Sequence, residues 1–125
     1  MQRKKAIVTG GSTGIGRGIV QSLAQAGYDV VFSYRNNEES AQNVLDELCK
    51  GYPEGTFKMV AADFGDKDAT KPFFKKAIEL LGGLDLLVNN AGVTLKNSIF
   101  DLDEREFDTL VQVDFRNYVF MMKEA

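Results

Sequence analysis

The chain has 125 residues, of which 44% are apolar, and its 15 basic and 18 acidic side chains give a net charge of −3, which is typical of one soluble domain. It contains no histidine and a single cysteine, Cys49. This composition excludes histidine-based hydrolysis and an internal disulfide, and we expect no metal site. No apolar stretch approaches the roughly 20 residues of a membrane helix, no signal peptide is recognisable, and the dispersed cations form no basic face. We therefore expect a cytoplasmic protein with neither nucleic acid nor a membrane as partner.

Four short apolar segments, rich in β-branched residues, predict strands of a parallel sheet. They are Lys5–Thr9, Asp29–Tyr34, Thr56–Ala61 and Leu84–Asn89. Between the strands, apolar residues recur at helical spacing and predict amphipathic helices. The first helix ends at Gly27, which suits a left-handed cap, and its stripe consists of Ile15, Ile19, Leu23 and Ala26.

The remaining helices follow the second, third and fourth strands. The second helix ends near Gly51, and its apolar stripe is Ala41, Val44, Leu45 and Leu48. The third helix ends at Gly82-Gly83, and its apolar stripe is Phe73, Phe74, Ala77, Ile78 and Leu81. Pro72 lies six residues past an expected helix start at Asp66, so we expect a kink or a delayed start there. Asp103 and Glu106 have capping-box spacing and open a last helix, whose stripe is Phe107, Leu110, Val111 and Phe115.

This alternation of strands and helices predicts an α/β fold, a Rossmann-type doubly wound parallel sheet of about four strands with flanking helices, which is half of the full fold. Its binding crevice is expected at the carboxyl ends of the strands. The fourth strand carries the apolar residues Leu84, Leu86, Leu87 and Val88. Because an open apolar edge favours aggregation, we expect this strand to pair with a further segment of the same protein or with another chain.

A glycine-rich loop joins the first strand to the first helix. Five of the twelve glycines fall between Gly10 and Gly18. Glycines let the backbone approach a diphosphate closely, and the helix start favours its negative charge. A nucleoside-triphosphate P-loop is the competing interpretation, but Arg17 and Gly18 stand where that motif needs Lys and Ser or Thr. Close packing of the first helix against the sheet remains the alternative without a ligand.

Two motifs carry a resemblance to a known family. Gly10-x-x-x-Gly14-x-Gly16 follows the first strand, and Asn89-Asn90-Ala91-Gly92 ends the fourth. Together they resemble the cofactor fingerprint and the Asn-Asn-Ala-Gly motif of the short-chain dehydrogenase/reductase family. The resemblance extends over all 125 residues and implies that residues 1–125 are an NAD(P)-binding Rossmann domain that ends before the family's catalytic Tyr-x-x-x-Lys segment.

The resemblance also implies roles for individual residues. The loop would hold the ribose and phosphates of the cofactor, Asp63 with Phe64 the adenine, and the Asn-Asn-Ala-Gly turn the adenosine ribose. The expected cofactor-binding residues are Gly10, Ser12, Thr13, Gly14, Ile15, Gly16, Tyr34, Arg35, Asp63, Phe64, Asn90, Ala91 and Gly92. Two of them have structural alternatives, since Asp63 could cap the next turn and Asn90 could tie the fourth strand to its neighbour.

The end of the second strand bears on the choice of cofactor. Tyr34 occupies the position of the family's NAD-binding Asp, and Arg35 follows where many NADP-using members have a basic residue. A guanidinium binds a 2′-phosphate bidentately, so NADP(H) is favoured and NAD(H) is the alternative. Thr13 stands where other NADP-dependent members have a second cation, and Arg35 could instead be a solvated loop residue.

The resemblance implies hydride transfer between the nicotinamide and a carbonyl or alcohol substrate, with 3-oxoacyl-thioester reduction favoured and sugar dehydrogenation as the other option. None of the tyrosines in these 125 residues is followed by Lys four positions later. The family's Ser, Tyr and Lys are thus expected downstream, and the chain alone is expected to bind cofactor weakly, to be poorly stable and to be inactive. The fourth catalytic position, an Asn in the family, is Asp114 here, and an ionised carboxylate accepts but does not donate hydrogen bonds. Asp114 as a plain helix residue is the alternative.

Three expectations concern surfaces and partners. Val93–Phe100 either forms one wall of the substrate site or is an ordinary loop. The full-length protein is expected to be a homodimer or homotetramer in which Phe107, Tyr118 and Phe120 face a partner subunit. The competing hypotheses are a non-catalytic dinucleotide-binding or regulatory module that pairs with another chain, and an unrelated α/β nucleotide switch or methyltransferase.

Overall fold

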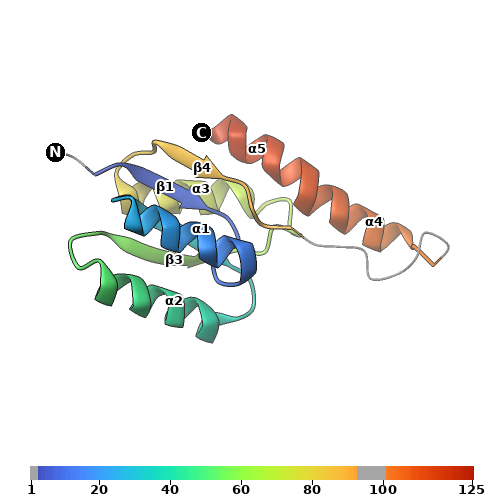
Figure 1. Ribbon diagram of the computed structural model, residues 1–125. Coiled ribbons are helices and arrows are strands. Elements are labelled where there is room, and N and C mark those ends of the chain that lie inside the picture. The colour runs from blue at the N-terminus through green and yellow to red at the C-terminus, as the bar shows by residue number, and fades with distance from the viewer. Residues whose placement is uncertain (1–2, 93–100) are drawn as a thin grey trace.

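Four parallel strands form the middle layer of the fold in the order β3-β2-β1-β4 (Figure 1). The strands are β1 (Lys5–Val8), β2 (Asp29–Tyr34), β3 (Phe57–Ala61) and β4 (Leu86–Val88). The computed structural model describes residues 3–92 and 101–125. Side chains of β1 alternate between the faces of the sheet, with Ala6 and Val8 in one apolar cluster and Ile7 in the other, and all three are fully buried. The expected doubly wound sheet is therefore confirmed.

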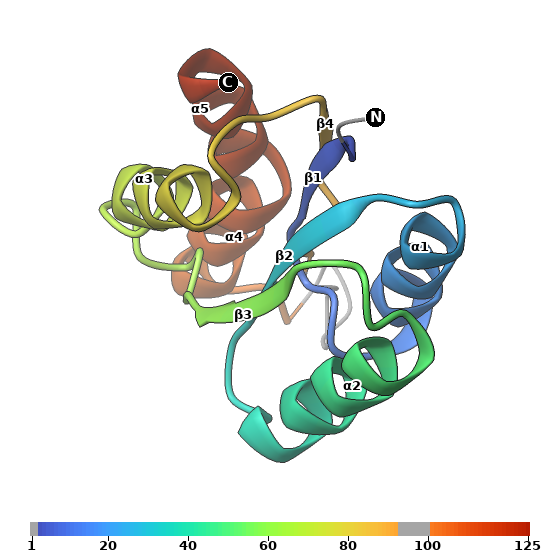
Figure 2. The same cartoon turned by 90° about the vertical axis from the view of Figure 1, so that its left-hand side faces the viewer.

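Helices cover both faces of this sheet (Figure 2). On one side lie α1 (Gly14–Gln25) and α2 (Glu38–Gly51), and on the other α3 (Thr70–Leu81) and a long C-terminal rod. The rod consists of α4 (Glu104–Val111), the π-helical turn η1 (Gln112–Arg116) and α5 (Asn117–Glu124). The expected caps are present, since Asp103 accepts a hydrogen bond from the Glu106 N–H at 2.7 Å and Gly27 has a φ of +92°.

The expected boundaries hold for β2 and shift elsewhere. β1 ends at Val8, β3 begins at Phe57, and β4 is shortened to Leu86–Val88. The helix does not begin at Asp66: α3 begins at Thr70, with Pro72 as its third residue, which confirms the delayed start that Pro72 led us to expect. Since the first N–H groups of a helix have no intrahelical partner, a proline loses no hydrogen bond at that position.

Two apolar stripes read from the sequence are only partly buried. Ile15 is 79% exposed, so its assignment to the core-facing stripe of α1 is wrong; the buried positions are Gly16, Val20 and Ala24. In the C-terminal rod, Phe107, Val111 and Phe115 are exposed. The buried face of the rod instead carries Val113, Asn117 and Met121. Helical spacing shows that an apolar face exists, but it does not show which neighbour covers it.

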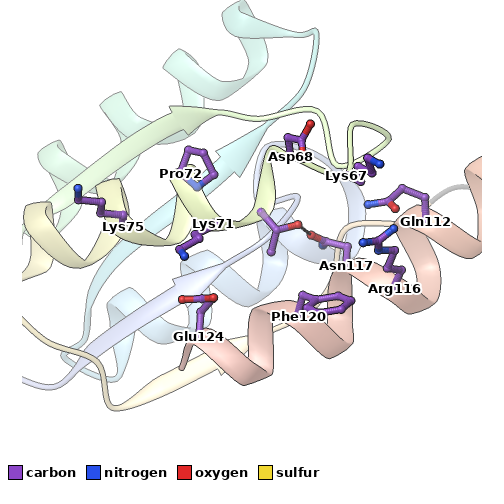
Figure 3. A pocket seen from close by; sticks show the side chains of 11 residues that line it. Lys67, Asp68, Lys71, Pro72, Lys75, Gln112, Arg116, Asn117, Phe120 and Glu124 are labelled. Carbon is purple, nitrogen blue, oxygen red and sulfur yellow. Dashed lines mark hydrogen bonds between the residues drawn. The ribbon is translucent and has the colours of Figure 1, made fainter.

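A buried polar contact joins α3 to α5. The Thr70 hydroxyl donates a hydrogen bond to Asn117 Oδ1, and both residues are buried. Thr70 and Asn117 both line a groove between α3 and the C-terminal rod. Lys67, Lys71, Lys75 and Arg116 line the same groove and are labelled with Asn117 in Figure 3. Asn117 Nδ2 is buried and has no hydrogen-bond partner among the residues that the structure describes. The Thr70 hydroxyl is thus the contact that offsets the burial of the Asn117 amide.

We expect Thr70→Val to lower the free energy of unfolding by about 1–3 kcal/mol, because the substitution leaves the buried Asn117 carbonyl without a donor. Urea denaturation measures the difference. The matched control is Thr109→Val, since the exposed Thr109 donates only to the Arg105 carbonyl within its own helix. Equal stability of the two variants would show that the buried contact contributes nothing.

Candidate functional site

A cavity of about 400 Å³ opens at the carboxyl ends of the strands, beside the start of α1. The strand order reverses here, because β1 lies between β2 and β4, and such a switch point is where doubly wound sheets bind ligands. Loops after all four strands and the turn η1 contribute to the lining, which is Gly10, Ser12, Thr13, Ile15, Gly16, Ser33, Tyr34, Arg35, Ala62, Asp63, Phe64, Asn90, Ala91, Gly92 and Val113. The fold thus brings together the residues expected to bind a cofactor, except that Gly14 does not line the cavity.

Two glycines of the loop are required by its geometry. Gly10 has a φ of +72°, in the left-handed region that other residues rarely adopt. A Cβ on Gly16 would lie 1.9 Å from the Gly10 carbonyl oxygen and 2.5 Å from Asn90 Nδ2. α1 therefore begins in direct contact with the ends of β1 and β4, and a side chain at residue 16 would force them apart.

The start of α1 is suited to an anion. Its N-cap residue, Thr13, makes no side-chain cap hydrogen bond, and the first turn contains no acidic residue. The first backbone N–H groups of a helix and the positive end of its dipole favour negative charge. Thr13, Ile15 and Gly16 line the cavity, so this end of α1 is available to a phosphate. Ile15 is exposed because it lies at the start of α1, where the helix borders the open cavity.

Hydroxyl groups at the ends of β1 and β2 hold the loops in place. Ser33 Oγ accepts a hydrogen bond from the Gly10 N–H at 2.8 Å. Thr9 Oγ1 accepts from the N–H groups of Asn90 and Ala91, each at 3.0 Å. The motifs indicated no role for Ser33 or Thr9, although a hydroxyl residue at the carboxyl end of a buried strand is a recognisable signal. Asn90 Nδ2 donates to the Gly10 carbonyl at 2.9 Å, which confirms that Asn90 ties β4 to β1.

The end of β2 places a cation at the cavity. Tyr34 and Arg35 both line it, and Arg35 is the one cation in the lining among the described residues. Arg17, although it lies in the glycine-rich segment, points away and pairs with Glu47 at 2.7 Å on the surface. The end of β2 therefore contributes a positively charged residue to the lining of the cavity.

The segment after β3 supplies Asp63 and Phe64. Asp63 Oδ1 accepts a hydrogen bond from the Gly65 N–H at 2.9 Å, which confirms the capping role that was its structural alternative. Asp63 also lines the cavity, so the two roles are compatible. Phe64 is buried against Phe73, and its carbonyl accepts from Gln112 Nε2 at 3.2 Å. The C-terminal rod thereby contacts the segment that carries the expected adenine-binding residues.

Asp114 lies in the π-helical turn η1, beside the last residue of the Asn-Asn-Ala-Gly motif. A Cβ on Gly92 would lie 3.2 Å from Asp114 Oδ1. π-helical turns within α-helices occur frequently at functional sites. Asp114 does not line the cavity, but its neighbour Val113 does. The structure therefore places Asp114 at the margin of the cavity, next to its wall.

Tyr118 in the C-terminal rod is hydrogen-bonded to the turn that lines the cavity. Tyr118 Oη donates a hydrogen bond to the Ala91 carbonyl at 2.5 Å, a contact within the chain that the expectation of a partner-facing Tyr118 did not include. Burial and, to a smaller extent, the nearby Asp114 carboxylate raise the pKa of Tyr118 above its ordinary value of 10.0. The phenol is therefore a hydrogen-bond donor at neutral pH.

Other parts of the molecule offer less chemistry. The groove between α3 and α5, about 650 Å³ in volume, shares no lining residue with the cavity at the strand ends. Within residues 3–92 and 101–125, no group of three or more His, Cys, Asp or Glu residues could hold a metal ion. No helix in this described part is both long and apolar enough to span a membrane. Residues 93–100, considered as a wall of the substrate site, lie outside the described residues.

The sequence profile of the short chain dehydrogenase family matches residues 4–125. The chain belongs to this family. The 3-oxoacyl-(acyl-carrier-protein) reductase FabG of Staphylococcus aureus strain Mu50 is 35% identical to it over 122 residues, which are 98% of this chain and 49% of that protein. This match confirms the resemblance that the glycine loop and the Asn-Asn-Ala-Gly motif indicated.

Solved structures of short-chain dehydrogenases superpose closely on this chain. A short-chain dehydrogenase/reductase from Serratia marcescens matches with a TM-score of 0.92 and 34% identity, over 99% of this chain and 50% of that one. A short chain dehydrogenase from Burkholderia cenocepacia in complex with NADP matches with a TM-score of 0.90 and 35% identity, over 96% and 48% of the two chains. The chain thus spans about half the length of these relatives, and the matched half is the Rossmann-type part described above.

Proposed function

We propose that residues 1–125 form the NADP(H)-binding domain of a short-chain dehydrogenase/reductase. The observation that carries this proposal is the cavity at the switch point of the sheet. The uncapped start of α1, Arg35 and the Asn90–Gly92 turn converge on it. A helix start and a guanidinium recognise two phosphate groups at different positions, as a dinucleotide with a 2′-phosphate requires.

The fit of the cofactor to these residues is chemical as well as spatial. Because Gly10 and Gly16 have no side chains, a pyrophosphate could approach the backbone of the loop closely. Ser12, in the same loop, offers a hydroxyl group to the cavity. Asp63 would accept a hydrogen bond from the adenine amino group, with Phe64 beside it. The Asn90–Gly92 turn would contact the adenosine ribose. When bound, the nicotinamide would supply or accept the hydride.

NADP(H) is favoured over NAD(H) by the charge of the cavity. A carboxylate that accepts from both ribose hydroxyls selects NAD, but Tyr34 stands at that position and Arg35 follows. A similar structure, that of the Burkholderia cenocepacia relative, is a complex with NADP. Thr13, at the position of a second cation in some members, adds no charge, so we propose that NAD(H) also binds, more weakly.

For the whole protein we propose an oxidoreductase that acts on a carbonyl or alcohol substrate, with a 3-oxoacyl thioester as the favoured class. The Staphylococcus aureus relative bears the name of a 3-oxoacyl-carrier-protein reductase, which supports this choice. The 125 residues contain no Tyr-x-x-x-Lys, so we propose that this chain alone is catalytically incomplete. Asp114, at the family's Asn position, would accept hydrogen bonds there and, when ionised, donate none.

We also propose that the complete protein acts in the cytoplasm as a homo-oligomer. Reducing conditions suit a chain whose one cysteine is exposed and unpaired. The exposed apolar residues of the C-terminal rod include Phe107 and Phe120, which are 52% and 41% exposed. Such residues are typical of a surface that another chain or segment covers.

Calorimetric titration tests the cofactor proposal. We expect the 125-residue chain and the complete protein both to bind NADPH, the complete protein more tightly, and NADH to bind each more weakly. In a parallel assay with ketones and 3-oxoacyl thioesters, only the complete protein should oxidise NADPH. Binding without turnover in the complete protein would favour the non-catalytic dinucleotide-binding module, and absence of binding in both would contradict the proposal.

A further inference from the structure

Tyr118 makes a contact between the C-terminal rod and the proposed cofactor site that its sequence context did not indicate. The residue is half-buried and lies in α5, one helical turn after Asp114. Its hydroxyl donates to the Ala91 carbonyl, and Ala91 lies in the turn that lines the cavity. The side chain itself does not line the cavity, so any effect on a ligand is exerted through this turn.

The turn at Asn90–Gly92 is held from two directions. On the side of the sheet, Thr9 Oγ1 accepts from the N–H groups of Asn90 and Ala91. On the side of the rod, Tyr118 binds the carbonyl of Ala91. The two peptide groups flanking Ala91 are thus fixed, one by its N–H and the other by its C=O, and their orientation determines where Ala91 and Gly92 face the cavity.

We propose that Tyr118 is a positioning residue for the cofactor: its hydroxyl holds the Ala91 carbonyl so that the Asn90–Gly92 turn is preorganised to bind NADP(H). This inference rests on the proposed function. Ligand affinity rises when a binding loop does not lose freedom on association. Tyr118 therefore contributes to cofactor affinity although its own side chain does not line the cavity.

The environment of Tyr118 preserves this role over the physiological pH range. Burial and the Asp114 carboxylate favour the neutral phenol, which is the form that donates. Asp114 also lies beside Gly92, so the rod contacts the turn at two successive residues. A phenylalanine would retain the ring and its packing but remove the donor.

The test is Tyr118→Phe in the complete-length protein, with NADPH affinity and dissociation rate followed by nicotinamide fluorescence at 15 °C. We expect affinity to fall about three- to tenfold, the usual effect of one lost hydrogen bond, through faster dissociation. Thr9→Val, which removes the opposite restraint, should change affinity in the same direction. Tyr52→Phe is the matched control, since the Tyr52 ring packs on Phe57, away from the cavity, and it should bind NADPH as the wild type does.

Thermal unfolding without cofactor separates positioning from a purely structural role. A lower melting temperature of Tyr118→Phe with unchanged NADPH affinity and dissociation rate would overturn the inference and leave the proposed function intact. Failure of the wild-type protein to bind NADPH would instead overturn the proposed function, and the inference with it. Weaker binding by Tyr118→Phe, with Tyr52→Phe unchanged, supports both.

Discussion

Gly16→Ala should weaken NADPH binding by more than about tenfold and lower the free energy of unfolding by about 1–3 kcal/mol. The added Cβ would lie 1.9 Å from the Gly10 carbonyl oxygen and 2.5 Å from Asn90 Nδ2. To remove this clash, the start of α1 must move away from the ends of β1 and β4. That movement would break the Asn90–Gly10 hydrogen bond and displace the backbone N–H groups proposed to bind phosphate. Calorimetric titration and urea denaturation measure the two effects.

Gly18→Ala is the matched control for this experiment. Gly18 lies two residues further along the same helix, and a Cβ there would meet no atom within 4 Å. Because alanine has the higher helix propensity, we expect Gly18→Ala to leave NADPH binding unchanged and to raise stability by about 0.5–1 kcal/mol. If Gly16→Ala behaves as Gly18→Ala does, the close approach of α1 to the strand ends is not needed for cofactor binding.

Arg35→Ser should weaken NADPH binding by about 10- to 100-fold and leave NADH binding nearly unchanged. The guanidinium is the cation in the cavity lining, and hydrogen bonds to charged groups contribute about 1.5–3 kcal/mol. NADH lacks the 2′-phosphate, so the substitution removes no phosphate contact from its complex. Titration of the variant with both cofactors gives the ratio of affinities, which should fall by the same factor.

The control for this substitution is Arg17→Ser. It removes the same charge from the chain, but Arg17 pairs with Glu47 on the surface, and exposed ion pairs contribute little. We expect its NADPH affinity to stay within about twofold of the wild type. An equal loss in both variants would indicate a long-range charge effect, and no loss in Arg35→Ser would contradict phosphate recognition by Arg35.

Local patterns predicted the sheet and most helix ends. A short apolar run with β-branched residues predicted β2 at its observed boundaries, and the spacing of Asp103 and Glu106 predicted the start of α4. These features depend on residues a few positions apart, for which backbone preferences and capping are decisive. The motifs at Gly10–Gly16 and Asn89–Gly92 likewise predicted which loops meet, because the carboxyl ends of parallel strands share one edge of the sheet.

Contacts between distant elements could not be predicted in this way. Ile15 has the spacing of a core residue, yet it lies at the cavity because α1 starts there. Tyr118 looks like a surface aromatic residue until α5 is placed beside the turn after β4. Thr70 and Asn117 are 47 positions apart, and their pairing follows only from the packing of α3 on α5. Each case depends on which element packs against a given face, and the spacing of apolar residues along the sequence does not identify that element.

The central claim is that the cavity at the strand ends holds NADP(H), and a crystal structure of the protein with NADPH tests it most directly. We predict the pyrophosphate at the backbone N–H groups that begin α1, the 2′-phosphate within hydrogen-bond distance of Arg35, and the adenine beside Asp63. NADPH bound elsewhere, for instance in the groove between α3 and α5, or in the cavity with its 2′-phosphate directed away from Arg35, would contradict the account.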